Sequence, residues 1–153
     1  SENALINIDS EIHNHDHPML LGAYGMIPND SINIKLMKNT LHYVLDNWNW
    51  ESTWGWDYPM IAMNAARIGM PEIAIEALLM DVQKNTYLNN GHNYQNDRLP
   101  IYLPGNGGLL TAVAMMARGW DGAPNIDAPG FPKNGDWVIK HEGLNILQYI
   151  KFC

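Results

Sequence analysis

Residues 57–82, which read DYPMIAMNAARIGMPEIAIEALLMDV, carry the clearest helical pattern in the chain. Proline is tolerated in a first helical turn, where its missing N–H would be unpaired anyway, so Pro59 and Pro71 each indicate a helix start. The pattern predicts a helix over about residues 57–68, with Gly69 directly after its end. The apolar face of the next helix comprises Ile75, Leu78, Leu79 and Val82. We therefore expect a tight αα-hairpin.

Two further helices are predicted on either side of this hairpin. Apolar residues recur every three or four positions over residues 31–48, which indicates an amphipathic helix capped by Asp30 or Ser31. Residues 107–120 are apolar nearly all round, which predicts a helix buried on every side. The contrast between half-exposed and fully covered helices favours two concentric layers over a simple bundle.

The connecting segments are polar and rich in turn-forming residues. Residues 1–30 read as a loop with a helical turn or two between Met19 and Ile27. Residues 85–106 read as a long loop, and loops of this length are usually functional or disordered.

The end of the chain is expected to differ from the helical part. Residues 137–141 and 144–152 resemble two short strands around Glu142 and Gly143, which predicts a C-terminal β-hairpin. We therefore divide the chain into a helical-hairpin portion, residues 1–120, and a loop and β tail, residues 121–153. The predicted fold class is all-α with this small β addition.

The composition limits the possible partners. The 153 residues suit one domain, and their net charge is −7, from nine Lys and Arg against sixteen Asp and Glu. Without a basic stripe, nucleic acid and anionic membranes are poor partners. No run approaches the roughly 18 apolar residues of a membrane span. A neutral ligand fits this surface better.

Residues 48–57, WNWESTWGWD, hold four of the six tryptophans and two carboxylates, Glu51 and Asp57. Flat indoles such as Trp54 and Trp56 stack on sugar rings, while carboxylates accept hydrogen bonds from sugar hydroxyls. This density of aromatic and acidic residues predicts a saccharide pocket. In the alternative interpretation, Trp48 and Trp56 anchor the core and Asp57 is a helix N-cap.

A second candidate group lies earlier in the chain. His13, His15 and His17 fall within five residues of one another, with Asp16 among them, a composition that allows a zinc site. No Cys or Glu-x-x-His partner stands nearby. Ligand binding by His17 or Asp16, and a plain solvated loop, remain alternatives to metal binding.

A third candidate is the glycine turn of residues 103–109, LPGNGGL. Helix N-termini attract anions, but the spacing does not match the known phosphate-binding loops. Close approach to a neutral ligand or helix capping fits better, with Asn106 as the polar contact. His92 and Tyr94, in the preceding loop, are expected to complete a wall of the same pocket.

The order of these motifs resembles glycoside hydrolase family 95, the inverting α-L-fucosidases and their relatives. Residues 15–28 resemble its His-Arg-His-x-x-x-x-Tyr-Gly-x-x-Pro segment, and residues 53–56, TWGW, stand where the family has Thr-Gly-Trp-Ser. Residues 64–69, NAARIG, resemble its Trp-Ala-Arg-Leu-Gly helix end, and residues 104–108, PGNGG, its Asp-Gly-Asn-Phe-Gly turn.

The resemblance implies an (α/α)6 toroid of six helical hairpins, of which this chain supplies roughly the last half. It also implies catalysis without a cofactor, a secreted or periplasmic location, and a general-acid Glu on hairpins upstream of Ser1. The family's sugar-contacting His corresponds to His17 and the neighbouring Arg to Asp16. The family's base corresponds to Pro104, which cannot act as a base, so Asp57 or Glu51 is expected to replace it.

These observations predict a glycoside hydrolase acting on an oligosaccharide, with Asp57 and Glu51 as catalytic carboxylates. An inverting mechanism requires two carboxyl groups roughly 6.5 to 9.5 Å apart. The expected sugar-binding residues are Asp16, His17, Trp54, Trp56, His92, Tyr94 and Asn106. One alternative is a glycan-binding toroid without catalysis. The other is a metal-dependent hydrolase using His13, His15 and His17.

Overall fold

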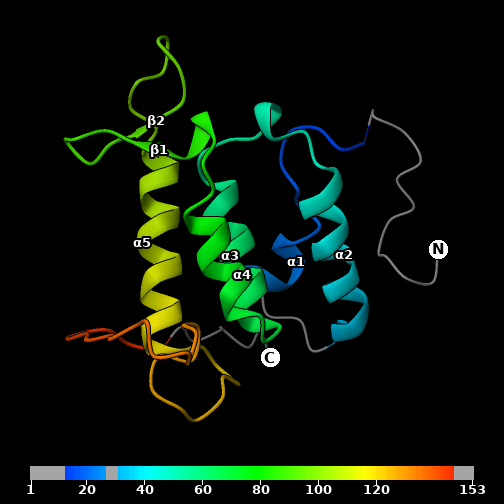
Figure 1. The fold of residues 1–153 in the computed structure, drawn as a ribbon, viewed down its shortest axis with the longest axis vertical. Helices are drawn as coiled ribbons and strands as arrows, with labels where there is room; N and C mark the ends of the chain where they lie inside the picture. The colour runs from blue at the N-terminus through cyan, green and yellow to red at the C-terminus, as the bar shows by residue number, and fades with distance from the viewer. Residues whose placement is uncertain (1–12, 27–30, 147–153) are drawn as a thin grey trace, which may run out of the picture.

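The computed structural model describes residues 13–26 and 31–146, which are mostly helical (Figure 1). The α-helices are α1 (Gly22–Gly25), α2 (Ile34–Asn47), α3 (Asp57–Arg67), α4 (Pro71–Leu78) and α5 (Leu103–Arg118). Two 3-10 turns, η1 (Trp50–Ser52) and η2 (Gln83–Asn85), and two strands, β1 (Thr86–Tyr87) and β2 (Asn93–Tyr94), complete the elements. The predicted helical class is thus confirmed, with a small antiparallel sheet added.

Helix α3 is the centre of the structure. Every residue from Asp57 to Ala66 is buried, because α1, α2, α4 and α5 all pack against this one helix. Figure 1 shows α2 and α5 at the two sides, with α1, α3 and α4 between them. Small residues such as Ala62 and Ala65 allow neighbouring helices to approach closely.

The prediction that residues 107–120 are buried on every side is wrong. Helix α5 packs chiefly on α3, where Gly108 lies close to Pro59, and its opposite face is open. Leu103 is 63% and Leu110 72% exposed. The fully covered helix is α3. Its sequence looked amphipathic because it contains the polar Asn64, but this side chain is buried and its amide donates to the backbone oxygen of Leu21.

The predicted helices around α3 are confirmed, with shifted ends. Helix α2 is capped by Asn33, whose side chain accepts a hydrogen bond from the N–H of Leu36 at 3.1 Å, in place of Asp30 or Ser31. Gly69, at φ +75°, ends α3 in the left-handed conformation as expected. Helix α4 ends at Leu78, so Leu79 and Val82 of the expected apolar face lie beyond the helix, and Leu79 is 70% exposed.

Residues 85–106 are more ordered than the predicted long loop. Strands β1 and β2 pair with Thr86 opposite Tyr94, and α5 already begins at Leu103. The side-chain amides of Asn93 and Gln95 are buried and donate to the backbone oxygen of Lys84, at 3.2 and 3.0 Å. These amide side chains, which the sequence places in a polar loop, therefore form a buried hydrogen-bonded scaffold.

The predicted strand at residues 137–141 is wrong. Described residues 120–146 contain no strand: Trp137 packs on Phe131 and Ile139 against the core, but Val138 between them is 83% exposed. The rest of the expected β-hairpin, residues 147–153, lies outside the described residues. Trp120, Ala128 and Phe131 instead join the core beneath α5, and the domain boundary at residue 120 stays a prediction.

Gly130 tests this packing of the terminal segment on α5. A Cβ at Gly130 would lie 2.5 Å from Cα of Met116, so Gly130→Ala is expected to lower the free energy of unfolding by about 2 kcal/mol in urea titrations. The matched control is Gly107→Ala within α5, where a Cβ meets nothing within 4 Å and alanine favours the helix. Equal stabilities of the two variants would contradict this packing.

Candidate functional site

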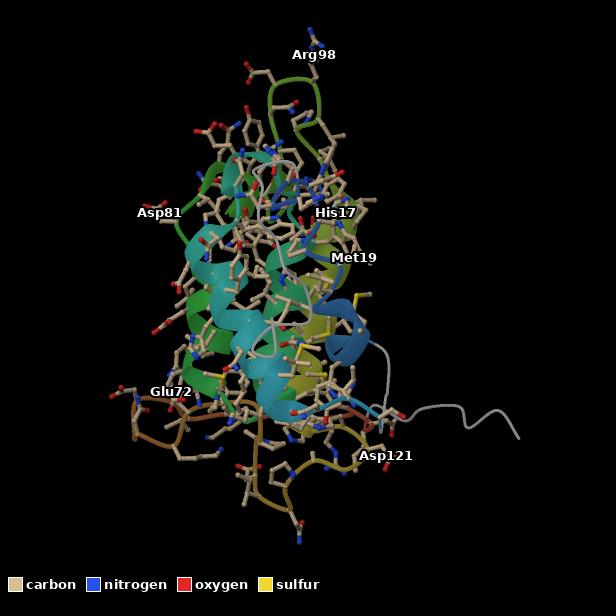
Figure 2. All side chains as sticks on the ribbon, turned by 90° about the vertical axis from the view of Figure 1, so that its right-hand side faces the viewer. His17, Met19, Glu72, Asp81, Arg98 and Asp121 are labelled. Carbon is tan, nitrogen blue, oxygen red and sulfur yellow. The ribbon has the colours of Figure 1, made fainter. Side chains whose placement is uncertain are left out.

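The side chains of His17 and Asp57 form a hydrogen-bonded pair between two segments that lie far apart in the sequence. Nδ1 of His17 lies 2.9 Å from Oδ1 and 3.1 Å from Oδ2 of Asp57. Asp57 is fully buried, whereas the side chain of His17 is 29% exposed. The pair thus links a buried carboxylate to the surface through an imidazole. Figure 2 shows His17 away from the end that carries Asp121.

Asp57 is positioned by the start of α3 but does not cap it. The helix N-cap is Trp56, without a side-chain cap, and the carboxylate of Asp57 turns back to accept the N–H of Trp54 at 2.7 Å. The alternative interpretation of Asp57 as an N-cap is therefore wrong. The two carboxylate oxygens of Asp57 instead bind the N–H of Trp54 and the imidazole of His17.

The loop that carries His17 is tied to the tryptophan segment through Asp16. Its N–H donates to Oγ of Ser52 at 2.8 Å, and its backbone oxygen accepts from Nε1 of Trp48 at 2.8 Å. Its carboxylate accepts from Nε1 of Trp54 at 3.1 Å. These bonds hold Asp16 at φ +61°, a left-handed conformation that Asp tolerates better than most residues.

We call the group Asp16, His17, Trp54, Trp56, Asp57 and Tyr102 the His17 cluster. The ring of Trp56 meets His17 edge-on at 5.0 Å between centroids, and Trp54 lies 6.2 Å from His17. Tyr102, at the start of α5, lies 5.6 Å from Trp54. Burial first, and then the charges of Asp57 and Asp16, raise the pKa of the Tyr102 hydroxyl.

The hydrogen bonds of His17 allow two proton arrangements. Nδ1 lies 3.0 Å from Nε1 of Trp56 as well as close to Asp57, but a single ring nitrogen cannot donate to one and accept from the other. When Asp57 is ionised, Nδ1 carries the proton and donates to it. When Asp57 is neutral, Nδ1 accepts from Trp56 and the ring proton moves to Nε2, which lies 3.5 Å from Oδ1 of Asp16. The protonation of a buried acid therefore sets whether Nε2, the nitrogen that faces Asp16, carries a proton or can accept one.

Asp57 is poised for this exchange near neutral pH. Burial raises the pKa of its carboxyl from 3.8 to about 6, although the hydrogen bonds from Trp54 and His17 and the charge of His17 oppose the rise. Its titration range is that of a general acid or base at neutral pH. Because the carboxyl is fully buried, it cannot touch a ligand directly, and His17 is the partly exposed side chain that it holds by a hydrogen bond.

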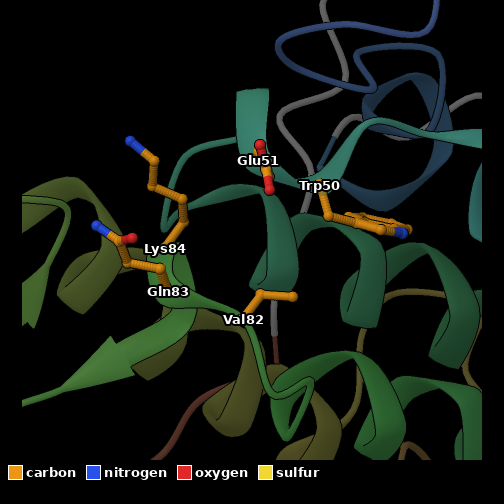
Figure 3. A pocket seen from close by; sticks show the side chains of 5 residues that line it. All are labelled: Trp50, Glu51, Val82, Gln83 and Lys84. Atoms are coloured by element: carbon orange, nitrogen blue, oxygen red, sulfur yellow. The ribbon is translucent and has the colours of Figure 1, made fainter.

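Glu51, the other predicted catalytic residue, faces a separate cavity of about 520 Å³ (Figure 3). The cavity is lined by Trp50, Glu51, Val82, Gln83 and Lys84, and we call it the Lys84 cavity. Nζ of Lys84 lies 5.1 Å from the centre of the Trp54 ring, so Trp54 connects this cavity with the His17 cluster.

Three predicted sugar-binding residues lie outside the cluster. Both polar atoms of Asn106 are engaged, Oδ1 with the N–H of Asn93 at 3.0 Å and Nδ2 with the oxygen of Gly91 at 2.7 Å. The hydroxyl of Tyr94 donates to Asp97 at 2.7 Å. His92 has a buried Nδ1 without a hydrogen-bond partner among the described residues. These residues support or border the hairpin, and their sugar contacts stay predictions.

The histidines do not form a metal site within the described part of the chain. His13 and His15 are exposed, and the imidazole of His15 lies 3.3 Å from the amide of Asn49. No group of three His, Cys, Asp or Glu side chains in residues 13–26 and 31–146 lies close enough to hold an ion. The geometry thus gives the metal-hydrolase alternative no support.

Sequence reasoning missed Lys84 and the supporting amides. Gln95 accepts the N–H of Gly55 at 3.0 Å through its side-chain oxygen, and Asn93 packs where a Cβ on Gly55 would lie. Gly55 is therefore required for the close approach of the two segments. No local pattern signals these long-range contacts, although the Trp-Gly-Trp sequence marks a place where backbone must come close.

Comparison of the chain with models of protein families, with characterised proteins and with solved structures finds no match. In the described residues, no helix has the length and apolar character needed to cross a membrane. The function must therefore be argued from the site itself.

The pKa of Asp57 gives a testable dependence of stability on pH. The folded state binds the proton of the Asp57 carboxyl more tightly than the unfolded state does. The stability gained from this proton is therefore full below the unfolded pKa of 3.8 and is lost as the pH rises through about 6. From about pH 4 to 7, the free energy of unfolding of the wild type relative to Asp57→Asn should fall by up to about 3 kcal/mol. Asp121→Asn, at an exposed site, is the control and should follow the wild type. A difference that stays constant or grows with pH would contradict the assignment.

Proposed function

We propose that the His17 cluster is part of the oligosaccharide site of a glycoside hydrolase. The observation that carries the proposal is the pairing of the surface imidazole of His17 with the buried carboxylate of Asp57, beside two tryptophans and the exposed carboxylate of Asp16. This group combines flat apolar rings and hydroxyl acceptors, which bind sugars, with a side chain that can transfer a proton.

Each member has a distinct task in this proposal. Asp16, with its side chain 67% exposed, accepts hydrogen bonds from sugar hydroxyls, and Trp54 offers ring surface beside it. His17 exchanges a proton with the glycosidic oxygen or with the attacking water through Nε2. Asp57 touches no ligand and serves as a positioning residue that selects the tautomer of His17. The sequence predicts Asp57 as a catalytic carboxylate, and this proposal replaces that role with an indirect one.

The toroidal architecture is also part of the proposal. It is supported by the motif order that resembles glycoside hydrolase family 95, by the α3–α4 hairpin, and by the buried central position of α3. The open apolar face of α5 suits a helix that has a further neighbour in a larger ring. A secreted or periplasmic location and a general-acid Glu on other hairpins belong to the same proposal.

A second candidate function is glycan binding without hydrolysis. It is favoured by the arrangement of the two predicted catalytic carboxylates: Asp57 is fully buried, and Glu51 faces the Lys84 cavity. Glycosidic hydrolysis normally needs two carboxyl groups flanking one bond. The described residues do not show such a flanking pair, whereas binding alone would need only the rings and the hydroxyl acceptors of the His17 cluster.

Binding is tested by titrating a panel of oligosaccharides into the wild-type chain by calorimetry. Trp54→Ala should weaken binding about fivefold, because it removes roughly 1 kcal/mol of ring contact. Trp137→Ala, which removes a tryptophan that is 40% exposed on another part of the surface, is the matched control and should bind like the wild type. Absence of binding to every sugar tested would refute both candidate functions.

Catalysis is tested by following the release of reducing ends from the oligosaccharides that bind. If the chain hydrolyses them, Asp57→Asn should lower kcat by about 100-fold or more while KM changes little, since the buried group acts on proton transfer and not on binding. Asp121→Asn is the control for loss of a carboxylate. Binding without release would favour the non-catalytic candidate, and unchanged kcat in Asp57→Asn would remove the His17 and Asp57 pair from the reaction.

A further inference from the structure

The Lys84 cavity is large enough for a small organic ligand. Its volume of about 520 Å³ lies within the range of about 300 to 1,000 Å³ that is typical of ligand sites. Figure 3 shows its walls, formed by the η1 turn with Trp50 and Glu51 on one side and by residues 82–84 on the other. Two segments about thirty residues apart thus enclose one space.

The lining has the mixed character of a sugar subsite. Trp50 and Val82 provide apolar surface, and Glu51 provides a hydroxyl acceptor. Nε2 of Gln83 donates to the backbone oxygen of Gln95 at 3.0 Å, which leaves its side-chain oxygen as a further acceptor. A ring with one apolar face and several hydroxyls suits these walls.

Lys84 adds a positive charge that the described structure does not neutralise. No carboxylate of the described residues lies within 4.0 Å of its ammonium group, although the chain carries a net charge of −7. Its backbone is held by the amides of Asn93 and Gln95, and its Nζ rests over the Trp54 ring at 5.1 Å. The cation is therefore positioned in advance for an anionic partner.

Trp54 joins this cavity to the His17 cluster. Lys84 lies over its ring, and its Nε1 donates to Asp16, which neighbours His17. An oligosaccharide bound at His17 would therefore extend along Trp54 towards the cavity. The ligand unit there should carry a negative charge for Lys84 and hydroxyl donors for Glu51, since both side chains line the cavity.

We propose that the Lys84 cavity binds an acidic sugar unit, a uronic acid whose carboxylate pairs with Lys84 while its hydroxyls donate to Glu51. This inference rests on the proposed oligosaccharide site and names the class of sugar that the site takes. The chain thereby selects charged over neutral glycans, in addition to the ring contacts of the His17 cluster.

The experiment compares uronate-containing oligosaccharides with the same compounds after reduction of the carboxyl to a hydroxymethyl group. Calorimetric titration of the wild type at low ionic strength should show the acidic forms binding about fivefold tighter, the scale of a partly exposed ion pair. The preference should shrink as salt is added to about 1 M. Lys84→Gln should abolish the preference, and Lys84→Arg should retain it.

The control is Lys140→Gln, which removes an exposed lysine and should keep the wild-type preference. Lys140 belongs to residues 120–146, the segment after α5 that lies at the end of the molecule away from β1 and β2 (Figure 1). Equal binding of acidic and reduced forms by the wild type, or a preference that survives Lys84→Gln, overturns the inference. If reduced sugars bind in a Trp54-dependent manner without any acid preference, only this inference fails. If no sugar of either kind binds, the proposed function fails with it.

Discussion

A carboxylate that is taken out of water must be compensated, and in this chain the compensation is two hydrogen bonds to Asp57, one from the N–H of Trp54 and one from the imidazole of His17. Asp57 stands at the first turn of the most buried helix, where the N–H of Trp54 and the imidazole are the donors within reach of its oxygens. The arrangement of the N-terminal loop depends on that requirement. Asp16 accepts its left-handed conformation because the bonds to Ser52, Trp48 and Trp54 hold His17 in place over the carboxylate.

A second group of buried polar side chains lies at the same end of the molecule. Asn93 and Gln95 are buried amides that tie the β1–β2 hairpin to the turn at Lys84, and Gln95 also binds the N–H of Gly55. Helix α3 starts beneath this scaffold and α5 starts beside it, with Tyr102 against Trp54. Three connections between helices therefore converge above one helix start, which is where loops carried on a rigid framework usually hold function.

The helices could be predicted from the sequence because their signals are local. Helix ends are indicated by the backbone properties of Pro59, Pro71 and Gly69, and the spacing of apolar residues indicates the apolar face of each helix. Burial could not be predicted in the same way: α5 is the more apolar helix, yet α3 is the covered one, because neighbours and not composition determine what is buried. The strand prediction for residues 137–141 failed for the same reason, since apolar spacing there does not produce a paired strand and Val138 is 83% exposed.

The candidate site was partly predictable. Asp16, His17, Trp54, Trp56 and Asp57 were selected by residue type, and the structure brings them together. Sequence could not show that Asp57 is buried and acts through His17, nor that Glu51 faces another cavity, because both depend on how segments about forty residues apart dock. Lys84 was missed because a single lysine in a polar loop carries no local signal until Trp54 and the buried amides are in place.

The central claim, that Asp57 holds the proton of His17 on Nδ1 and leaves Nε2 for a ligand, is tested most directly by the tautomer of this histidine. Long-range proton–nitrogen NMR spectra of the labelled chain should be recorded at about pH 8, where Asp57 is ionised because its pKa is about 6. We expect the Nδ1–H form for His17 in the wild type and its loss in Asp57→Asn. An Nε2–H form that is the same in both proteins would contradict the account.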